Sequence, residues 1–127
     1  MVLNNVFQTN ELISKALHAT QLRNSVITHN IANVDVPGFR RGVVEFESYF
    51  QNELDRSERT GSRINTRNIQ PSLSFSNENL PHRLDGNNVD IEHEMVSLYQ
   101  NSARYETMAI SLMNNYRRIN VVLNSNI

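Results

Sequence analysis

Residues 90–123 read DIEHEMVSLYQNSARYETMAISLMNNYRRINVVL, a run without proline or glycine. Positions spaced alternately four and three apart form a seam in which only Ser102 is polar: Ile91, Met95, Leu98, Ser102, Tyr105, Ala109, Leu112, Tyr116, Ile119 and Leu123. This spacing is typical of a helix in a coiled coil. It predicts a helix over residues 89–124, capped by Asn88 or Asp90 and roughly 50 Å long at 1.5 Å per residue. Because one helix cannot bury such a seam alone, the rest of the chain or another subunit must supply a partner.

A second helix is predicted over residues 11–34, after a short arm or helical lead-in at residues 1–9. Its seam follows the same spacing and is apolar at five of seven positions: Ile13, Leu17, Thr20, Asn24, Ile27, Ile31 and Val34. The fold class is therefore mainly α, with two long terminal helices pairing as a coiled coil. Two alternatives stay open, a helical hairpin within one domain and a role in bridging subunits.

The apolar surface of the C-terminal helix is broader than one partner requires. Beside the seam lie Val96, Tyr99, Ala103, Met108, Ile110, Met113 and Val122. This surface is interpreted either as a thick core made with the middle of the chain or as contacts with several neighbours in an assembly.

The middle region, residues 35–88, is predicted to contain a turn and irregular, partly extended chain within a single domain of residues 1–127. Residues 43–50 suit a strand or a short helix. Residues 51–70 are polar and charged, which predicts an exposed, mobile loop. Leu73 and Phe75 alternate with serines, which suggests a short strand.

The composition excludes several classes of function. The chain has 127 residues, no cysteine and a formal net charge of −1, which rules out disulfides and thiolate chemistry and argues against a nucleic-acid binder. The N-terminus has no basic region followed by an apolar core, and no run of 18 apolar residues occurs. We therefore expect neither a cleaved Sec signal nor a membrane-spanning helix.

No catalytic or metal-binding pattern is present in the sequence. His93 and Glu94 begin a zinc HExxH motif, but the second histidine would fall at Ser97. Acidic and amide residues surround Gly86 without the alternate spacing and final glutamate of a calcium loop. We expect no enzyme, no metal and no cofactor.

The end of the first helix carries a distinctive turn, NIANVDVPGFRR at residues 30–41. Asn33 is expected to adopt a left-handed cap conformation, and Pro37 cannot extend the helix. In a type II turn Gly38 would have a positive φ, and Phe39 is expected to dock against the helices or a neighbour.

This stretch resembles the N-terminal signature of flagellar basal-body rod and hook proteins. The matching residues, taken as an assembly motif, are Asn30, Ile31, Ala32, Asn33, Pro37, Gly38 and Phe39. Val36 stands where that family usually has Thr or Ser, which puts a side-chain cap in doubt but not the turn. A second stretch, DGNNVDIEHEM at residues 85–95 with Asn101, Arg104 and Tyr105, resembles the C-terminal half of the short proximal-rod members.

The resemblance implies a structural subunit of the proximal rod of the bacterial flagellar basal body, assembling helically and transmitting torque from motor to hook. It implies type III export without a cleaved Sec signal and a location on the periplasmic side. The implied partners are other copies of the chain, rod proteins of the FlgC type, the adaptor FliE, the MS ring and the flagellar export gate. The alternative is a soluble helical adaptor or export chaperone of a secretion system.

Overall fold

The computed structural model describes residues 2–78 and 83–125, so residues 79–82 of the predicted middle region lie outside the described residues. The elements are, in order, α1 (Val2–Ala32), β1 (Gly42–Glu45), α2 (Glu47–Thr60), the 3-10 helix η1 (Thr66–Asn68), β2 (Ser72–Phe75) and α3 (Ile91–Asn124). The prediction of a mainly α fold with two long terminal helices is confirmed. α1 begins at Val2, well before the predicted start at residue 11, and the Gln8 amide of this first part donates to the Ile64 carbonyl oxygen at 2.8 Å.

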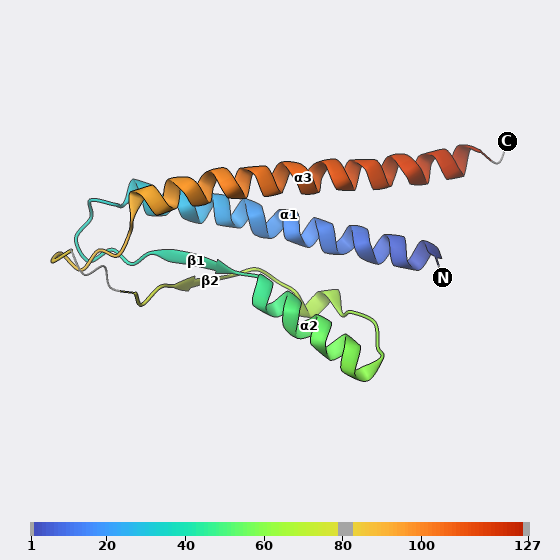
Figure 1. Cartoon of the computed structure of the whole chain (residues 1–127), viewed down its shortest axis with the longest axis horizontal. Helices are drawn as coiled ribbons and strands as arrows, with labels where there is room; N and C mark the ends of the chain where they lie inside the picture. The colour runs from blue at the N-terminus through green and yellow to red at the C-terminus, as the bar shows by residue number, and fades with distance from the viewer. Residues whose placement is uncertain (1, 79–82, 126–127) are drawn as a thin grey trace.

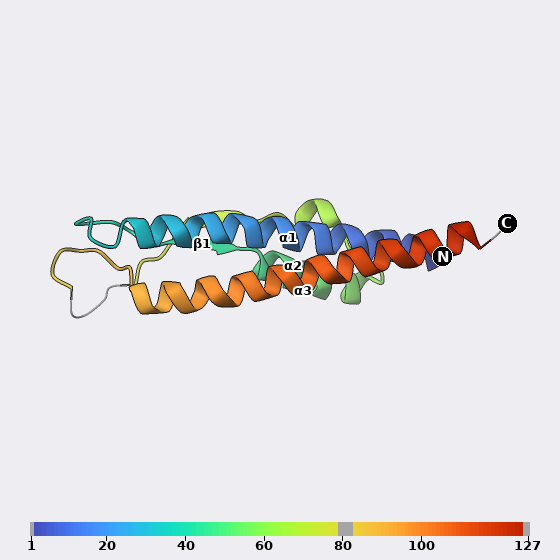
Figure 2. The same ribbon diagram turned by 90° about the horizontal axis from the view of Figure 1, so that it is seen from above.

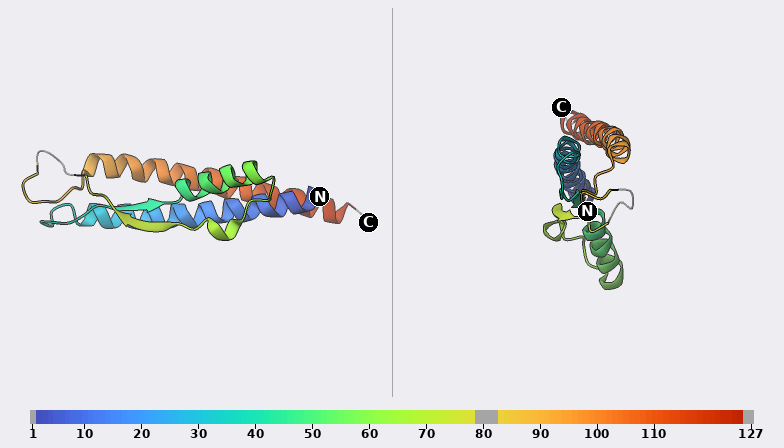
Figure 3. Two further views of the ribbon diagram at one scale, coloured as in Figure 1. Left: turned by 90° about the horizontal axis from the view of Figure 1, so that it is seen from below. Right: turned by 90° about the vertical axis from the view of Figure 1, so that its left-hand side faces the viewer.

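α1 is the central element of the molecule. Figure 1 shows α3 running antiparallel to α1 along one side, while the β1–β2 hairpin and α2 lie along the other side. The end-on view in Figure 3 shows the same three layers, with α1 between α3 and α2. Seen from above, α1 and α3 cross at a shallow angle (Figure 2). Both termini lie at one end, and the turn that follows α1 lies at the other (Figure 1).

α2 contradicts the prediction of a mobile loop over residues 51–70. The helix has 14 residues, ends at Thr60 and is capped by Gly61, which has a left-handed conformation with a φ of 63°. Its few apolar residues are spaced so that they share one face. Phe50 packs beside Phe46 at a ring-centroid distance of 6.3 Å, next to a small core that includes Ala19 of α1. The polar residues of this segment form the solvent-exposed face of a helix and do not indicate an unstructured chain.

The two strands form an antiparallel hairpin in which Gly42 pairs with Phe75 and Glu45 pairs with Ser72. Residues 43–50, which suited either a strand or a short helix, contain parts of both, since a strand ends at Glu45 and a helix begins at Glu47. The strand predicted around Leu73 is confirmed.

Polar side chains occupy the most buried positions of α3 against α1. The Asn101 amide donates to the Thr20 carbonyl oxygen at 2.8 Å, and the Asn115 amide donates to the Asn10 side-chain oxygen at 2.9 Å. Asn10 and Asn101 are buried. Buried amides of this kind fix the register of two paired helices, because another register would leave them without partners.

The predicted seam of α3 is divided between two faces. The partly buried members are Leu98, Ala109, Leu112 and Ile119. Apolar and aromatic members with 37–68% of their surface exposed are Ile91, Met95, Tyr105, Tyr116 and Leu123. Glu94 and Asn101 are buried in place of Met95 and Ser102, because their polar side chains bond to residues of α1. At these two positions, the buried residue is therefore the one that precedes the predicted seam residue. Packing of the exposed seam residues on a neighbouring copy stays a prediction.

Candidate assembly site

The turn after α1 is a type II β-turn over residues 36–39. The Phe39 amide donates to the Val36 carbonyl oxygen at 3.2 Å, and Gly38 has a φ of +71°. The expected positive φ at Gly38 is therefore confirmed. The Phe39 ring is partly buried and lies 5.5 Å from the His29 ring of α1, centroid to centroid. Phe39 thus docks on the helix that the turn follows.

The expected left-handed cap at Asn33 is wrong, since among the described residues only glycines have a positive φ. The last carbonyl oxygens of α1 accept from the Asn33 and Val34 amides, and a distant side chain binds the carbonyl oxygens of the turn that follows. The buried Asn87 amide donates to the carbonyl oxygens of Asn33, Val34 and Val36 at 3.0, 3.0 and 2.8 Å. Its own oxygen accepts a hydrogen bond from the Val89 amide at 2.8 Å. The Asn87 side chain therefore holds the turn after α1 and positions the chain that leads into α3.

Asn30 joins α1 to β1 by imitating a neighbouring strand. The Gly42 amide donates to Asn30 Oδ1, and Asn30 Nδ2 donates to the Gly42 carbonyl oxygen, both at 2.9 Å. Gly42 allows this approach, because a Cβ at that position would lie 2.9 Å from Val26 Cγ1. Asn30 is 1% exposed, so both of its polar atoms depend on these partners.

Glu94, a fully buried carboxylate on the first turn of α3, ties the two sequence motifs together. It accepts a hydrogen bond from Asn30 Nδ2 at 2.9 Å and from Arg41 Nε at 2.5 Å. The Arg41 guanidinium supplies the opposite charge that a buried carboxylate requires. α1, the turn after it and the start of α3 therefore meet at one side chain.

Asn88 extends the same network to the end of β2. Its Oδ1 accepts from the Arg41 amide at 2.6 Å, and its Nδ2 donates to the carbonyl oxygens of Ser76 and Glu78 at 3.1 and 2.8 Å. The Gly38 amide donates to the Asp85 carbonyl oxygen at 2.8 Å. Asp90 caps α3, as one of the two expected residues, by accepting from the amides of Glu92 and His93. We call this network, centred on Asn30, Arg41, Asn87, Asn88 and Glu94, the junction.

The junction contains part of the predicted assembly motif. Asn30 is buried, Ile31, Asn33 and Phe39 are partly buried, and Ala32, Pro37 and Gly38 are exposed. The sequence does not reveal Asn87, Asn88 and Glu94 as partners of this motif, although the stretch that contains them carries the second resemblance. The residues near Gly86 were weighed as calcium ligands, and their amides prove to satisfy backbone carbonyls instead.

The junction can act as a rigid corner. Its buried amides and carboxylate bond to one another and to the backbone, so they hold the turn, the hairpin and α3 in a defined arrangement around the end of α1. Within residues 2–78 and 83–125, no three His, Asp or Glu side chains are grouped closely enough to hold a metal ion. Over the same residues, no helix combines the length and the apolarity needed to cross a bilayer.

Proteins similar to this chain include flagellar basal body rod proteins from several bacteria. Residues 14–40 match the family model described as Flagella basal body rod protein. The flagellar basal body rod protein FlgB of Borrelia hermsii is 34% identical over 137 residues, which cover 94% of this chain and 98% of that protein. FlgB of Borreliella burgdorferi is 29% identical over 95% of this chain and 99% of its own length. FlgB of Bacillus subtilis is 28% identical over 87% of this chain and 89% of its own length. With 34% identity over nearly the full length of both chains, this protein belongs to the family of FlgB flagellar basal body rod proteins.

Proposed function

We propose that this protein is a structural subunit of the proximal rod of the bacterial flagellum, where it assembles helically and transmits torque from motor to hook. Membership of the FlgB family supports the rod assignment. The paired helices support the mechanical role, because two long helices joined by buried amides resist sliding along each other.

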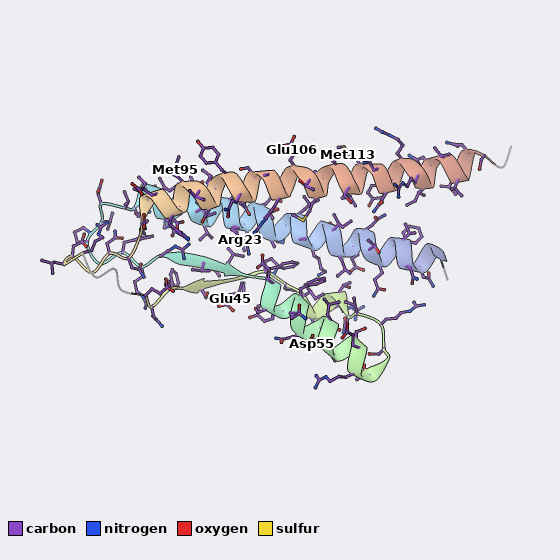
Figure 4. The ribbon with its side chains drawn as sticks, in the orientation of Figure 1. Arg23, Glu45, Asp55, Met95, Glu106 and Met113 are labelled. Atoms are coloured by element: carbon purple, nitrogen blue, oxygen red, sulfur yellow. The ribbon has the colours of Figure 1, made fainter. Side chains whose placement is uncertain are left out.

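The observation that carries this proposal is the amount of apolar surface left exposed along α3. Tyr99 is 70% exposed, Met113 58%, Tyr116 52% and Leu123 68%. Figure 4 shows Met113 on the side of α3 that faces away from α1. Large exposed apolar surface on a small chain marks a site of interaction with other proteins. A subunit that completes its core only within an assembly has this character.

The proposed neighbours follow from the family and not from any contact in the single chain. They are further copies of the chain, FlgC-type rod proteins, the adaptor FliE, the MS ring and the export gate. The proposed location is the periplasmic side of the basal body, reached by type III export without a cleaved Sec signal. The proposed role is structural and not enzymatic, which is supported by the engagement of the junction's polar side chains in holding the fold.

The test is to delete the gene for this chain, to reintroduce it, and to measure motility and the presence of the chain in purified basal bodies. We expect the deletion strain to lack completed rods and motility, and we expect the restored chain to remain in washed, purified basal bodies. A soluble adaptor or export chaperone would restore motility but would be absent from the washed basal bodies. Absence of the chain from intact basal bodies would therefore contradict a structural role.

A further inference from the structure

α3 carries a second heptad stripe, distinct from the face that packs on α1. Its positions alternate three and four apart: Val96, Tyr99, Ala103, Glu106, Ile110 and Met113. All six residues are exposed, and five of the six are apolar or aromatic. Figure 4 shows Glu106 and Met113 on the outer side of α3. This spacing is the one by which helices pack in coiled coils, so the outer stripe is suited to another helix or pair of helices.

The same molecule has a groove that would accept a helix. A cavity of about 580 Å³ opens between α1, α3 and the start of α2. Its apolar lining includes Ala16, Ala19, Phe46, Ala103 and Met108. Three of these residues are alanines, and small side chains allow the backbone of a docked helix to approach closely.

The charges of the groove and of the outer stripe are opposite. Arg23 and Arg104 line the groove together with Glu47, so the three side chains sum to +1 at neutral pH. Arg23 pairs with Glu47 at 2.7 Å, and Arg104 is exposed. On the outer stripe, Glu106 is the acidic residue, placed midway between Tyr99 and Met113. A helix entering with its outer stripe would bring a carboxylate to a groove with an excess guanidinium.

We propose that the outer stripe of one copy docks in the groove of a second copy of this chain. The proposal rests on the proposed function and specifies one of its contacts. The stripe and the groove share only Ala103, so a docked pair still offers the stripe of one copy and the groove of the other to further copies. Such a head-to-tail contact generates an open helical array, whereas stripe-to-stripe pairing would close into a dimer.

Cysteine cross-linking tests the contact directly, because the natural chain has no cysteine to give a background. One copy would carry Ala16→Cys in the groove and a second, differently tagged copy would carry Ile110→Cys on the stripe. We expect an oxidised heterodimer from the mixture. Ser111→Cys, at an exposed polar position about 100° around α3 from Ile110 at 3.6 residues per turn, is the matched control and is expected to give none with the groove variant. Thr107→Cys is a second, exposed groove position in case Ala16→Cys misfolds.

Charge reversal provides the independent measurement. Glu106→Arg and Arg104→Glu should each weaken self-association in sedimentation by about fivefold or more, and mixing the two variants should restore it, because each stripe then meets an opposite groove. A wild-type chain that stays monomeric at the highest concentration, homodimers of Ile110→Cys in place of the heterodimer, or no recovery on mixing would each overturn the proposal. Failure of this contact while the chain is still found in basal bodies would leave the rod assignment standing.

Discussion

Two glycines near the end of α1 are required for different physical reasons. Gly38 has a φ of +71°, which disfavours any residue with a side chain, yet a Cβ there would meet no atom within 4 Å. Gly42 has no such backbone constraint, but a Cβ there would lie 2.9 Å from Val26 Cγ1 and 3.4 Å from Leu73 Cδ1. Substitutions at Gly38 therefore strain the backbone, whereas substitutions at Gly42 collide with neighbours.

Gly38→Val is expected to cost roughly 1–3 kcal/mol, because a β-branched residue is held in the left-handed region. Gly38→Asn should cost less, because asparagine tolerates that region. Urea unfolding of both variants measures the difference. In the cell we expect Gly38→Val to be made and exported but to assemble poorly, since the turn also aims Phe39 at His29. Normal numbers of completed basal bodies in that strain would show that the turn does not determine assembly.

Gly42→Ala is expected to destabilise the chain by about 1–3 kcal/mol through overpacking between α1 and β1. The cause is steric, so Val26→Ala in the same chain should recover part of the loss by removing the colliding methyl groups. A double-mutant cycle measured by urea unfolding gives the interaction between the two sites. Purely additive effects would mean that the contact with Val26 is not the cause.

At the scale of single elements, α2 depends on one buried carboxylate. Glu53 pairs with Arg56 and also accepts from the Asn65 amide at 2.6 Å and from Asn68 Nδ2 at 3.2 Å. The hydrogen bonds from Arg56 and then from the Asn65 amide lower the pKa of Glu53 from its ordinary value of 4.5 to about 2. These contacts join α2 to the segment that contains η1.

The docking of α2 is therefore expected to weaken in acid. A carboxyl group with a lowered pKa in the folded state stabilises the fold above its unfolded pKa and loses that effect as the pH falls from 4.5 towards about 2. Glu53→Gln should lower stability at neutral pH and reduce the loss over this acid range. Amide hydrogen exchange within residues 47–60 measures the effect, with Glu58→Gln, exposed on the same helix, as the control. Equal acid sensitivity of the Glu53→Gln variant and the natural chain would contradict the assignment.

The helices were predictable from sequence to different degrees. The terminal helices have apolar residues at regular spacing over many turns, so their existence followed from the pattern. α2 was missed because only Phe50 and Leu54 mark its apolar face within residues 47–60. The buried face of α3 was displaced because Glu94 and Asn101 are buried by specific partners on α1. A polar side chain can be buried when a distant residue satisfies its hydrogen bonds. The residue type alone does not indicate such burial.

Leu112→Asp tests the inward part of the seam. Leu112 is partly buried on α3, and a carboxylate there is expected to cost about 2 kcal/mol, within the usual range for burying an unpaired polar group. Ser111→Asp, which adds the same charge at an exposed neighbouring position, should change stability by less than about 0.5 kcal/mol. Thermal unfolding compares the two variants. Normal swimming of a strain that carries Leu112→Asp would contradict the role of this position.

At the scale of the whole molecule, the single chain has a narrow core. Its buried apolar side chains include Ala19, Ile27, Phe46, Ile69 and Val89. In the α1–α3 interface, two buried atoms, Asn10 Nδ2 and Asn101 Oδ1, have no hydrogen-bond partner among the described residues. Each such atom reduces the stability of the helix pair. The pairing of the long helices is thus specific in register but modest in strength.

The dilute, isolated chain is accordingly expected to show less helix than α1 and α3 would give when fully formed. Long helices in water take most of their stability from packing, and much of α3 is exposed in the single chain. Circular dichroism over a range of concentrations should show helix content rising as copies associate. A dilute monomer that already has both helices fully formed would contradict this expectation.

The junction was only partly accessible from sequence. The turn at Pro37 and Gly38 could be predicted from the sequence, because few residue types suit a type II turn. Asn87 binds Val36 from 51 positions along the chain and Glu94 binds Asn30 from 64 positions, and only the folded structure brings these residues together. Similarity to a family indicated that both stretches matter, but the hydrogen bonds explain why they occur together.

The antiparallel pairing of the first and last helices also sets when the chain can fold. Asn10 and Asn115 are in contact although 105 positions separate them, so α1 has its partner only after nearly the whole chain is present. During synthesis, or during passage N-terminus first through any narrow channel, the 31-residue α1 can pack on the hairpin and α2 but lacks α3 as a partner. Contacts between such distant segments form late and slow the folding reaction. The chain is therefore expected to stay accessible to other proteins until the part of α3 that contains Asn115 is available.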